Sequence, residues 1–320
     1  MGEKRSHGPF GKIKFFYPNG QWWHVPGTGQ SRDRPGHWPG CSRTRWDAPG
    51  RERGYHNATP RFHPRRFPVN ATDQQSQQSV RPTIVLVHGA FADASSWNGV
   101  IERLQQQGYT VIATANPLRG LAADSAYTAS LLNQIDGPVL LVGHSYAGAV
   151  ITTAATSAPN VVGLVYIAAF ATEEGENLND VESGSKDSIL GAALVQYKYP
   201  AGPDGETAVE LAVKPALFGE AFAADLPAET VALMAATQRP TAVTAFSEAS
   251  GPPAWKKLPS WTVVATGDKA AGADVIRSQA QRAGAHITEV EGSHVIMISQ
   301  PQAVTDVIVT AAKAVADSRR

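Results

Sequence analysis

Residues 143–148 read GHSYAG and place Ser145 directly after a run typical of a buried strand, VLLV at residues 139–142. A serine hydroxyl becomes a strong nucleophile only when a base takes its proton and nearby donors stabilise the oxyanion. A sharp turn from a strand into a helix helps with both, because it exposes the serine above the sheet and points a helix N-terminus at the negative charge. The segment therefore predicts a nucleophilic serine for acyl transfer.

The fifth position of this turn departs from the usual pattern, which is G-x-S-x-G. Ala147 stands there, and the glycine follows one place later at Gly148. Because alanine is also small, the turn can still close without a steric clash. We therefore interpret Ser145 as a nucleophile rather than as a serine that only caps the following helix.

The base that such a serine needs is predicted at His294, in the run EGSH after the strand expected at residues 287–291. Loops that leave the carboxyl ends of parallel strands meet over one edge of the sheet, so His294 can reach Ser145. The other histidines beyond residue 72 belong to other motifs or begin a strand: His88, His144 and His286.

A carboxylate must fix the tautomer of the base and stabilise its positive charge. Asp268 is favoured because it directly follows the strand expected at residues 262–266, in the run VVATGDKA. Acidic residues at less favourable places stay open as alternatives: Asp274, Glu173 and Glu174.

Donors for the oxyanion are predicted after the first strand, where the chain reads HGAF. Gly89 allows a turn that leaves backbone N–H groups unpaired, so the N–H of Ala90 or Phe91 can act together with that of Tyr146. Each such donor contributes roughly 2.7–4 kcal/mol to the transition state. His88 is expected to hold this loop in a structural role.

The elements that must position these residues alternate between strands and helices beyond residue 80. Apolar runs predict strands at residues 83–87, 110–113, 139–142, 161–168, 262–266 and 287–291. Helices are expected after a cap at Ser95 or Ser96, at residues 125–135, 145–156 and 273–283, and from Pro301. This order implies an α/β fold with a mostly parallel, doubly wound sheet and helices on both faces.

Residues 171–259 interrupt the alternation. A segment of this length is too long for a simple connection, and it predicts a small helical cap over the carboxyl ends of the strands. Helices are expected within it near residues 218–224 and 228–237. Its aromatic residues are expected mainly to pack the cap onto the body: Tyr197, Tyr199, Phe218, Phe222 and Trp255.

The first 72 residues differ in composition from the rest. They carry 13 of the 28 Lys and Arg but only 4 of the 28 Asp and Glu, together with 9 prolines and 10 glycines. Such a segment buries too little apolar surface to offset its chain entropy. Residues 1–79 are therefore predicted to be a basic, disordered extension and linker, and residues 80–320 one domain. Nucleic-acid binding by the basic tail is an alternative that we consider weaker.

The one cysteine, Cys41, excludes a disulfide within the chain and a cysteine-based metal cage. No apolar stretch approaches the ~20 residues that a membrane-spanning helix needs. We therefore expect a cytoplasmic protein that uses no metal or organic cofactor. Whether it forms a homodimer stays open.

The strings VLVHGAF, VGHSYAG, LVYIAAF and GSH resemble the α/β-hydrolase superfamily. They are similar to its cap-bearing branch, which contains plant methylesterases, hydroxynitrile lyases and bacterial salicylate-esterase-like proteins. The resemblance covers about residues 82–316 and implies a triad of Ser145, Asp268 and His294, in the chain order of these hydrolases. It also implies oxyanion donors at Ala90 and Tyr146.

The lyases of this branch carry threonine after the first-motif histidine and lysine after the triad histidine. This chain has Gly89 and Val295 there, which disfavours the lyase activity. We predict a serine hydrolase of small carboxylic esters that forms an acyl-enzyme on Ser145. A cofactor-free lyase or dioxygenase that uses His294 and Asp268 as its base stays open. A ligand-binding protein without activity is a weaker alternative, because a receptor need not keep a complete triad.

Overall fold

The computed structural model describes residues 15–16, 22–23, 81–202 and 204–319. The chain divides into two units, Met1–Ala71 and Thr72–Arg320. In the first unit, β1 (Phe15–Phe16) pairs antiparallel with β2 (Trp22–Trp23). Apart from these strands, the predicted disordered extension lies outside the described residues, and so does the nucleic-acid alternative.

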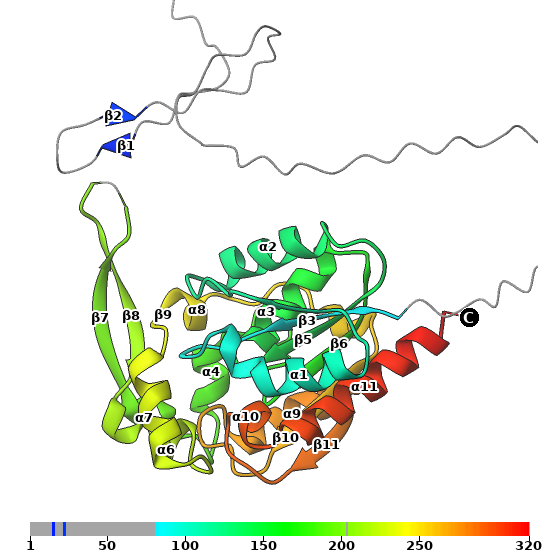
Figure 1. The fold of residues 1–320 in the computed structure, drawn as a ribbon. Coiled ribbons are helices and arrows are strands. Elements are labelled where there is room, and N and C mark those ends of the chain that lie inside the picture. Colours follow the sequence, from blue (N-terminus) through cyan, green and yellow to red (C-terminus); the bar gives the residue numbers. More distant parts are fainter. Residues whose placement is uncertain (1–14, 17–21, 24–80, 203, 320) are drawn as a thin grey trace, which may run out of the picture. The chain divides into compact units, whose positions relative to one another are not determined.

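A six-stranded sheet forms the centre of the second unit, in the order β11-β10-β6-β5-β3-β4 (Figure 1). Its strands are β3 (Thr83–Val87), β4 (Val111–Thr114), β5 (Val139–His144), β6 (Val161–Ile167), β10 (Ser260–Ala265) and β11 (His286–Val290). All neighbouring pairs run parallel. The predicted parallel sheet is confirmed, and each predicted strand is found at its place with small shifts at the ends.

Helices cover both faces of this sheet (Figure 1). They are α1 (Asn98–Gln106), α2 (Leu121–Leu132), α3 (Ala147–Ala154), α9 (Ala273–Arg282) and α11 (Pro301–Asp317). Successive residues of a strand point to opposite faces, so Ile84 and Leu86 of β3 share one core with α1 and α11. Val85 and Val87 share the other core with α2 and α3. The continuously apolar strands follow from this burial on both sides.

Two predicted helix starts were wrong. The first helical segment begins as η1 (Ala94–Trp97), and its cap is Asp93, whose side chain accepts a 2.7 Å hydrogen bond from Ser95 N. Helix α2 begins four residues earlier than expected. Ala122 N, in the first turn of α2, donates a 2.8 Å hydrogen bond to the Glu248 side chain. A cap that comes from so far along the chain leaves no local pattern in the sequence.

The strand order reverses between β3 and β5. The chain passes from β3 to β4 on one side of β3 and then crosses to β5 on its other side. The loops after β3 and β5 therefore diverge at the carboxyl edge and leave a crevice, where α/β sheets commonly bind ligands. The loops at this crevice are those that carry HGAF and Ser145.

The inserted segment between β6 and β10 combines helices with a second sheet. Its helices include α4 (Leu178–Ser183), α5 (Leu190–Ala193), α6 (Pro215–Phe222), α7 (Ala228–Thr237) and α8 (Thr244–Ser247). Its antiparallel strands are β7 (Leu194–Pro200), β8 (Thr207–Val213) and β9 (Thr241–Ala242). The two predicted helical stretches are confirmed as α6 and α7. The description as a purely helical cap missed the hairpin β7–β8, which extends away from the parallel sheet (Figure 1).

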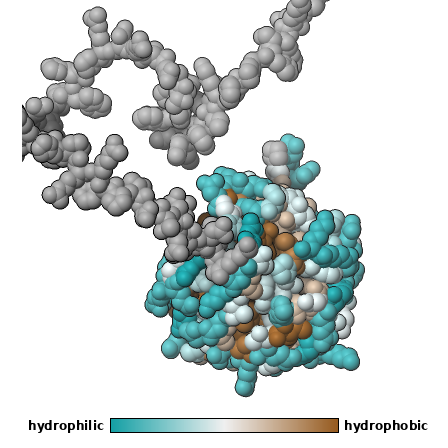
Figure 2. Space-filling model, turned by 90° about the vertical axis from the view of Figure 1, so that its right-hand side faces the viewer, coloured by the Kyte–Doolittle hydropathy of each residue, from teal (hydrophilic) through white to brown (hydrophobic). Residues whose placement is uncertain are grey.

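On the face that Figure 2 shows, hydrophilic residues dominate, and hydrophobic residues form small separate areas between them. In the part of the chain that the structure describes, no helix is both long and apolar enough to cross a membrane.

Candidate active site

Ser145 lies at a sharp turn between β5 and α3. Its φ angle is 55°, in the left-handed region that residues other than glycine rarely adopt. The turn is fixed by neighbouring backbone, because Ser145 N donates to Ile167 O and Phe170 N donates to Ser145 O, both at 3.3 Å. Such a strained backbone costs about 1–3 kcal/mol and is typical of functional sites. The predicted strand-to-helix elbow is therefore present.

The glycines that flank this turn are required by close backbone approach. A Cβ added at Gly143 would lie 2.7 Å from Ala147 O, and one at Gly148 would lie 2.4 Å from Phe170 O. The methyl group of Ala147 is fully buried in the core. The departure from the usual G-x-S-x-G pattern is thus accommodated, because the crowded position is 148 rather than 147.

Backbone strain concentrates at the carboxyl edge of the sheet. Among the described residues, those other than glycine with positive φ each follow a different strand: Phe91, Leu118, Ser145 and Ala168. Since left-handed backbone persists only where the surroundings enforce it, this edge is where the fold holds residues in unfavourable conformations. It is also the edge that carries the predicted catalytic residues.

His294 and Asp268 form a buried pair at this edge. His294 Nδ1 lies 2.8 Å from Asp268 Oδ2, and both side chains are 1 % exposed. The other oxygen, Asp268 Oδ1, accepts hydrogen bonds from Ala270 N at 2.9 Å and Ala271 N at 3.0 Å. These donors orient the carboxylate so that His294 Nδ1–H donates to it. In that tautomer His294 Nε2 is unprotonated and can act as a base.

The alternative acids are bound elsewhere. Asp274 accepts hydrogen bonds from Ser185 Oγ at 2.6 Å and Lys186 N at 2.8 Å, so it fastens a loop of the inserted segment. Glu173 forms an ion pair with Lys256, and Glu174 is exposed. Among the acidic candidates, the described contacts therefore bring only Asp268 to His294.

His144 connects the serine turn to the histidine loop. Its Nε2–H donates to His294 O at 3.0 Å, and the two imidazole rings lie 4.7 Å apart. The base is thus held against the residue that precedes Ser145. Within the described part of the chain, no hydrogen bond from the Ser145 hydroxyl is present. Catalytic hydrogen bonds often tighten only when substrate binds.

The predicted oxyanion donors are backbone N–H groups of Ala90 or Phe91, in the loop after β3, and of Tyr146, after β5. Phe91 N donates to Thr241 Oγ1 at 3.4 Å, whereas the backbone N–H groups of Ala90 and Tyr146 show no protein acceptor among the described residues. Both residues are buried. Of the two predicted alternatives in this loop, Ala90 is therefore the better candidate.

Two residues that hold the site in place were not predicted from the sequence. Asp225 of the inserted segment accepts from Ser293 N at 2.9 Å and also from the Ser293 hydroxyl, which fixes the loop before His294. Asp124 accepts a 2.7 Å hydrogen bond from the Tyr146 hydroxyl. Both contacts join distant parts of the chain, so no local motif marks them.

His88 holds the loop after β3, as expected. Its Nδ1–H donates to Gly89 O, and its Nε2 accepts from Asn116 N, each at 3.0 Å. This pattern requires a neutral ring. Burial lowers the pKa of His88 to about 4, and burial lowers the pKa of His144 as well.

These buried histidines should make the fold sensitive to mild acid. A histidine with a lowered pKa in the folded state stabilises the protein above its unfolded pKa of about 6.5, and this stability is lost as the pH falls toward the folded pKa. For His88 alone, the free energy of unfolding should fall by about 2 kcal/mol between pH 7 and pH 5. His144 should add to that loss.

Urea unfolding of the protein at both pH values measures this effect. His88→Gln should show a smaller loss between the two pH values than the unsubstituted protein. The control is His286→Gln, because His286 is exposed and stacks on Trp261. A loss that is the same in all three proteins would contradict the assignment to His88.

A cavity of about 520 Å³ lies in the inserted segment. Ser145 and His294 do not line it, but Phe246 does, and its ring lies 5.9 Å from the ring of Tyr146 and 6.1 Å from that of Phe91. Phe222 of α6 lies 5.0 Å from the His294 ring. The inserted segment therefore contacts the site residues through Phe222 and Phe246, and Phe246 also borders the cavity. Among the described residues, no group of three or more His, Cys, Asp or Glu could hold a metal ion.

Comparisons with known proteins identify the family of the chain. Residues 84–307 match the alpha/beta hydrolase family. A carbendazim hydrolyzing esterase from Nocardioides sp. (strain SG-4G) is 32% identical over 107 residues, which span 29% of this chain and 44% of that relative. The chain thus matches less than half the length of that curated relative.

Solved structures share the fold. A polyneuridine aldehyde esterase superposes with a TM-score of 0.62 at 19% identity, covering 72% of this chain and 98% of that one. A methylesterase from Arabidopsis superposes with a TM-score of 0.59 at 19% identity, covering 73% and 99%. The resemblance to the α/β-hydrolase superfamily that the sequence motifs indicated is confirmed by the family match, and these structures have the same fold.

Proposed function

The chain belongs to the alpha/beta hydrolase family, and we propose that it hydrolyses small carboxylic esters through an acyl-enzyme on Ser145. The observation that carries this proposal is the buried Asp268–His294 pair, held against the residue next to a strained serine turn. The similar proteins described above support this proposal, since all three are named as esterases.

In the proposed mechanism, His294 Nε2 takes the proton of the Ser145 hydroxyl as the oxygen attacks the ester carbonyl. Ala90 N–H and Tyr146 N–H donate to the oxyanion that forms. His294 then gives the proton to the departing alcohol, and the acyl group stays on Ser145. A water molecule that loses its proton to His294 releases the acid and restores the serine. Asp268 stabilises the imidazolium in both halves of the reaction.

The crowding at Gly89 also favours hydrolysis over the lyase alternative. A Cβ at this position would lie 2.7 Å from Ser145 Cβ and 2.8 Å from His144 O. The threonine that the related lyases carry there cannot be accommodated in this chain without moving the serine turn. The site therefore lacks room for that side chain beside the nucleophile.

The kinetics of nitrophenyl acetate hydrolysis test the proposal. If an acyl-enzyme forms and deacylation is slower than acylation, nitrophenol should be released in a rapid burst. An acetyl group should also be found on Ser145 in rapidly quenched protein. Intact-mass analysis of the quenched protein detects the acetyl group even where no burst is resolved. Turnover of the ester without acetylated protein at any time would favour a mechanism in which His294 activates water directly.

A further inference from the structure

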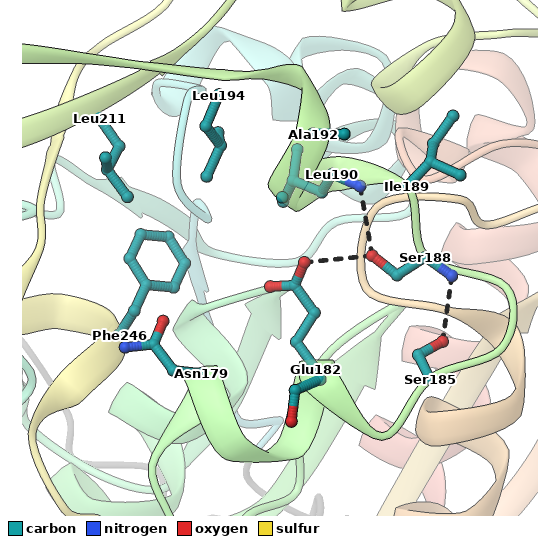
Figure 3. A pocket seen from close by; sticks show the side chains of 12 residues that line it. Asn179, Glu182, Ser185, Ser188, Ile189, Leu190, Ala192, Leu194, Leu211 and Phe246 are labelled. Carbon is teal, nitrogen blue, oxygen red and sulfur yellow. Dashed lines mark hydrogen bonds between the residues drawn. The ribbon is translucent and has the colours of Figure 1, made fainter.

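A single carboxyl group lies among the apolar residues of the cap cavity (Figure 3). It belongs to Glu182 on α4, which is only partly exposed. Apolar side chains surround the space in front of it: Leu190, Leu194, Leu211 and Phe246. Since Phe246 also packs on Phe91 and Tyr146, a substrate that reaches from Ser145 into this cavity would pass close to Glu182.

One oxygen of Glu182 is bound to Ser188. The Ser188 hydroxyl faces two acceptors, Ala270 O at 2.7 Å and Glu182 Oε1 at 3.1 Å. Ser188 Oγ in turn accepts a 3.3 Å hydrogen bond from Leu190 N. These contacts fix the Glu182 carboxyl at the wall of the cavity.

The surroundings of Glu182 act against its negative charge. Burial raises the pKa of this carboxyl, and the charge of Asp268 acts in the same direction. The Ser188 hydrogen bond and the nearness of His294 oppose the rise without cancelling it. These interactions also place Glu182 close enough to the catalytic pair for their charges to interact.

We propose that Glu182 selects esters that carry an N–H or O–H donor in the part of the molecule that enters the cap cavity. With one oxygen accepting from Ser188, Glu182 leaves its second oxygen as a further acceptor, which points away from Ser188 in Figure 3. This oxygen has no protein partner among the described residues. A ligand group without a donor would leave it unsatisfied, whereas an N–H or O–H would satisfy it. The inference rests on the proposed esterase function.

Two esters of nearly equal shape test the inference: methyl para-hydroxyphenylacetate, which carries a donor, and methyl para-methoxyphenylacetate, which carries only an acceptor. We expect a kcat/KM about tenfold higher for the hydroxyl ester with the unsubstituted protein. Glu182→Leu should reduce this ratio to about one. Glu182→Gln should keep the preference, because the amide can donate to Ser188 and still present an oxygen to the cavity.

The control is Glu220→Gln, an exposed glutamate on α6, which should leave the ratio unchanged. Equal rates for the two esters with the unsubstituted protein would overturn the inference. A preference that survives Glu182→Leu would also overturn it. If Glu182 had only a structural role at the loop of Ala270, its substitution would lower both rates alike and leave their ratio unchanged. If the leucine variant does not fold, Glu182→Met replaces it.

Nitrophenyl acetate separates this inference from the proposed function. Its acetyl group is too small to need the cavity, so its hydrolysis reports on Ser145 and His294. If the protein hydrolyses it and shows no preference between the test esters, the specificity inference alone fails. If the protein hydrolyses none of the three esters, the esterase proposal fails. If only nitrophenyl acetate is turned over, the two test esters are compared as inhibitors of that reaction. The ratio of their inhibition constants then replaces the ratio of their kcat/KM values.

Discussion

Ser145→Ala should remove nearly all hydrolysis of short aryl esters while the protein stays folded. The substitution removes the oxygen that attacks the carbonyl, and no other described nucleophile lies at the turn between β5 and α3. In a serine protease, the loss of the nucleophile lowers kcat by about 2 × 10⁶-fold. The measurement is the rate of nitrophenol release from nitrophenyl acetate, compared with the rate in buffer.

Thermal unfolding of the same variant provides the control for folding. Because alanine must adopt the same left-handed backbone as Ser145, its stability should stay close to that of the unsubstituted protein. Residual activity above that in buffer is expected from the oxyanion donors alone. A variant that keeps most of its turnover would show that Ser145 is not the nucleophile.

Asp268→Asn should lower the turnover by orders of magnitude. The amide of asparagine carries no negative charge and can donate as well as accept a hydrogen bond. His294 can therefore adopt the tautomer whose Nε2 is protonated, and this tautomer cannot act as the base. The comparable substitution in a serine protease lowers kcat by about 10⁴-fold. The readout is kcat for nitrophenyl acetate as a function of pH, which reports the protonation of the base.

Asp274→Asn is the matched control for this prediction. Asp274 lies near the start of α9 and binds Ser185 and Lys186 rather than the histidine. Its replacement loosens a loop of the cap and should change the turnover only a few-fold. If Asp274→Asn were the more damaging of the two substitutions, the assignment of the orienting acid to Asp268 would be wrong.

The parallel sheet could be predicted because its strands are apolar on both faces and the helices between them carry regular apolar stripes. The apolar stripe on α11, which includes Val304, Val307 and Ile308, is buried. The hairpin β7–β8 was missed although residues 202–205 read GPDG, a typical turn sequence. β7 is exposed or half-buried throughout and β8 is mostly half-buried, so their apolar pattern is weaker than that of the central sheet.

The residues at strand ends were predictable because parallel strands bring their following loops to one edge. That rule placed Ser145, Asp268 and His294 together before any contact was known. The residues that hold them were not predictable. Asp225 reaches Ser293 from the cap, and Glu182 acts through Ser188, so each depends on how the inserted segment folds back onto the sheet. Neither carries a sequence motif.

The most direct test of the central claim is covalent labelling of the full chain by a fluorophosphonate. This reagent phosphonylates a serine hydroxyl that a histidine base activates. We predict one labelled peptide containing Ser145, no labelling of Ser145→Ala, and labelling that is strongly slowed in Asp268→Asn. Esterase activity in a protein that resists the reagent, or labelling that persists after Ser145→Ala, would contradict the central claim.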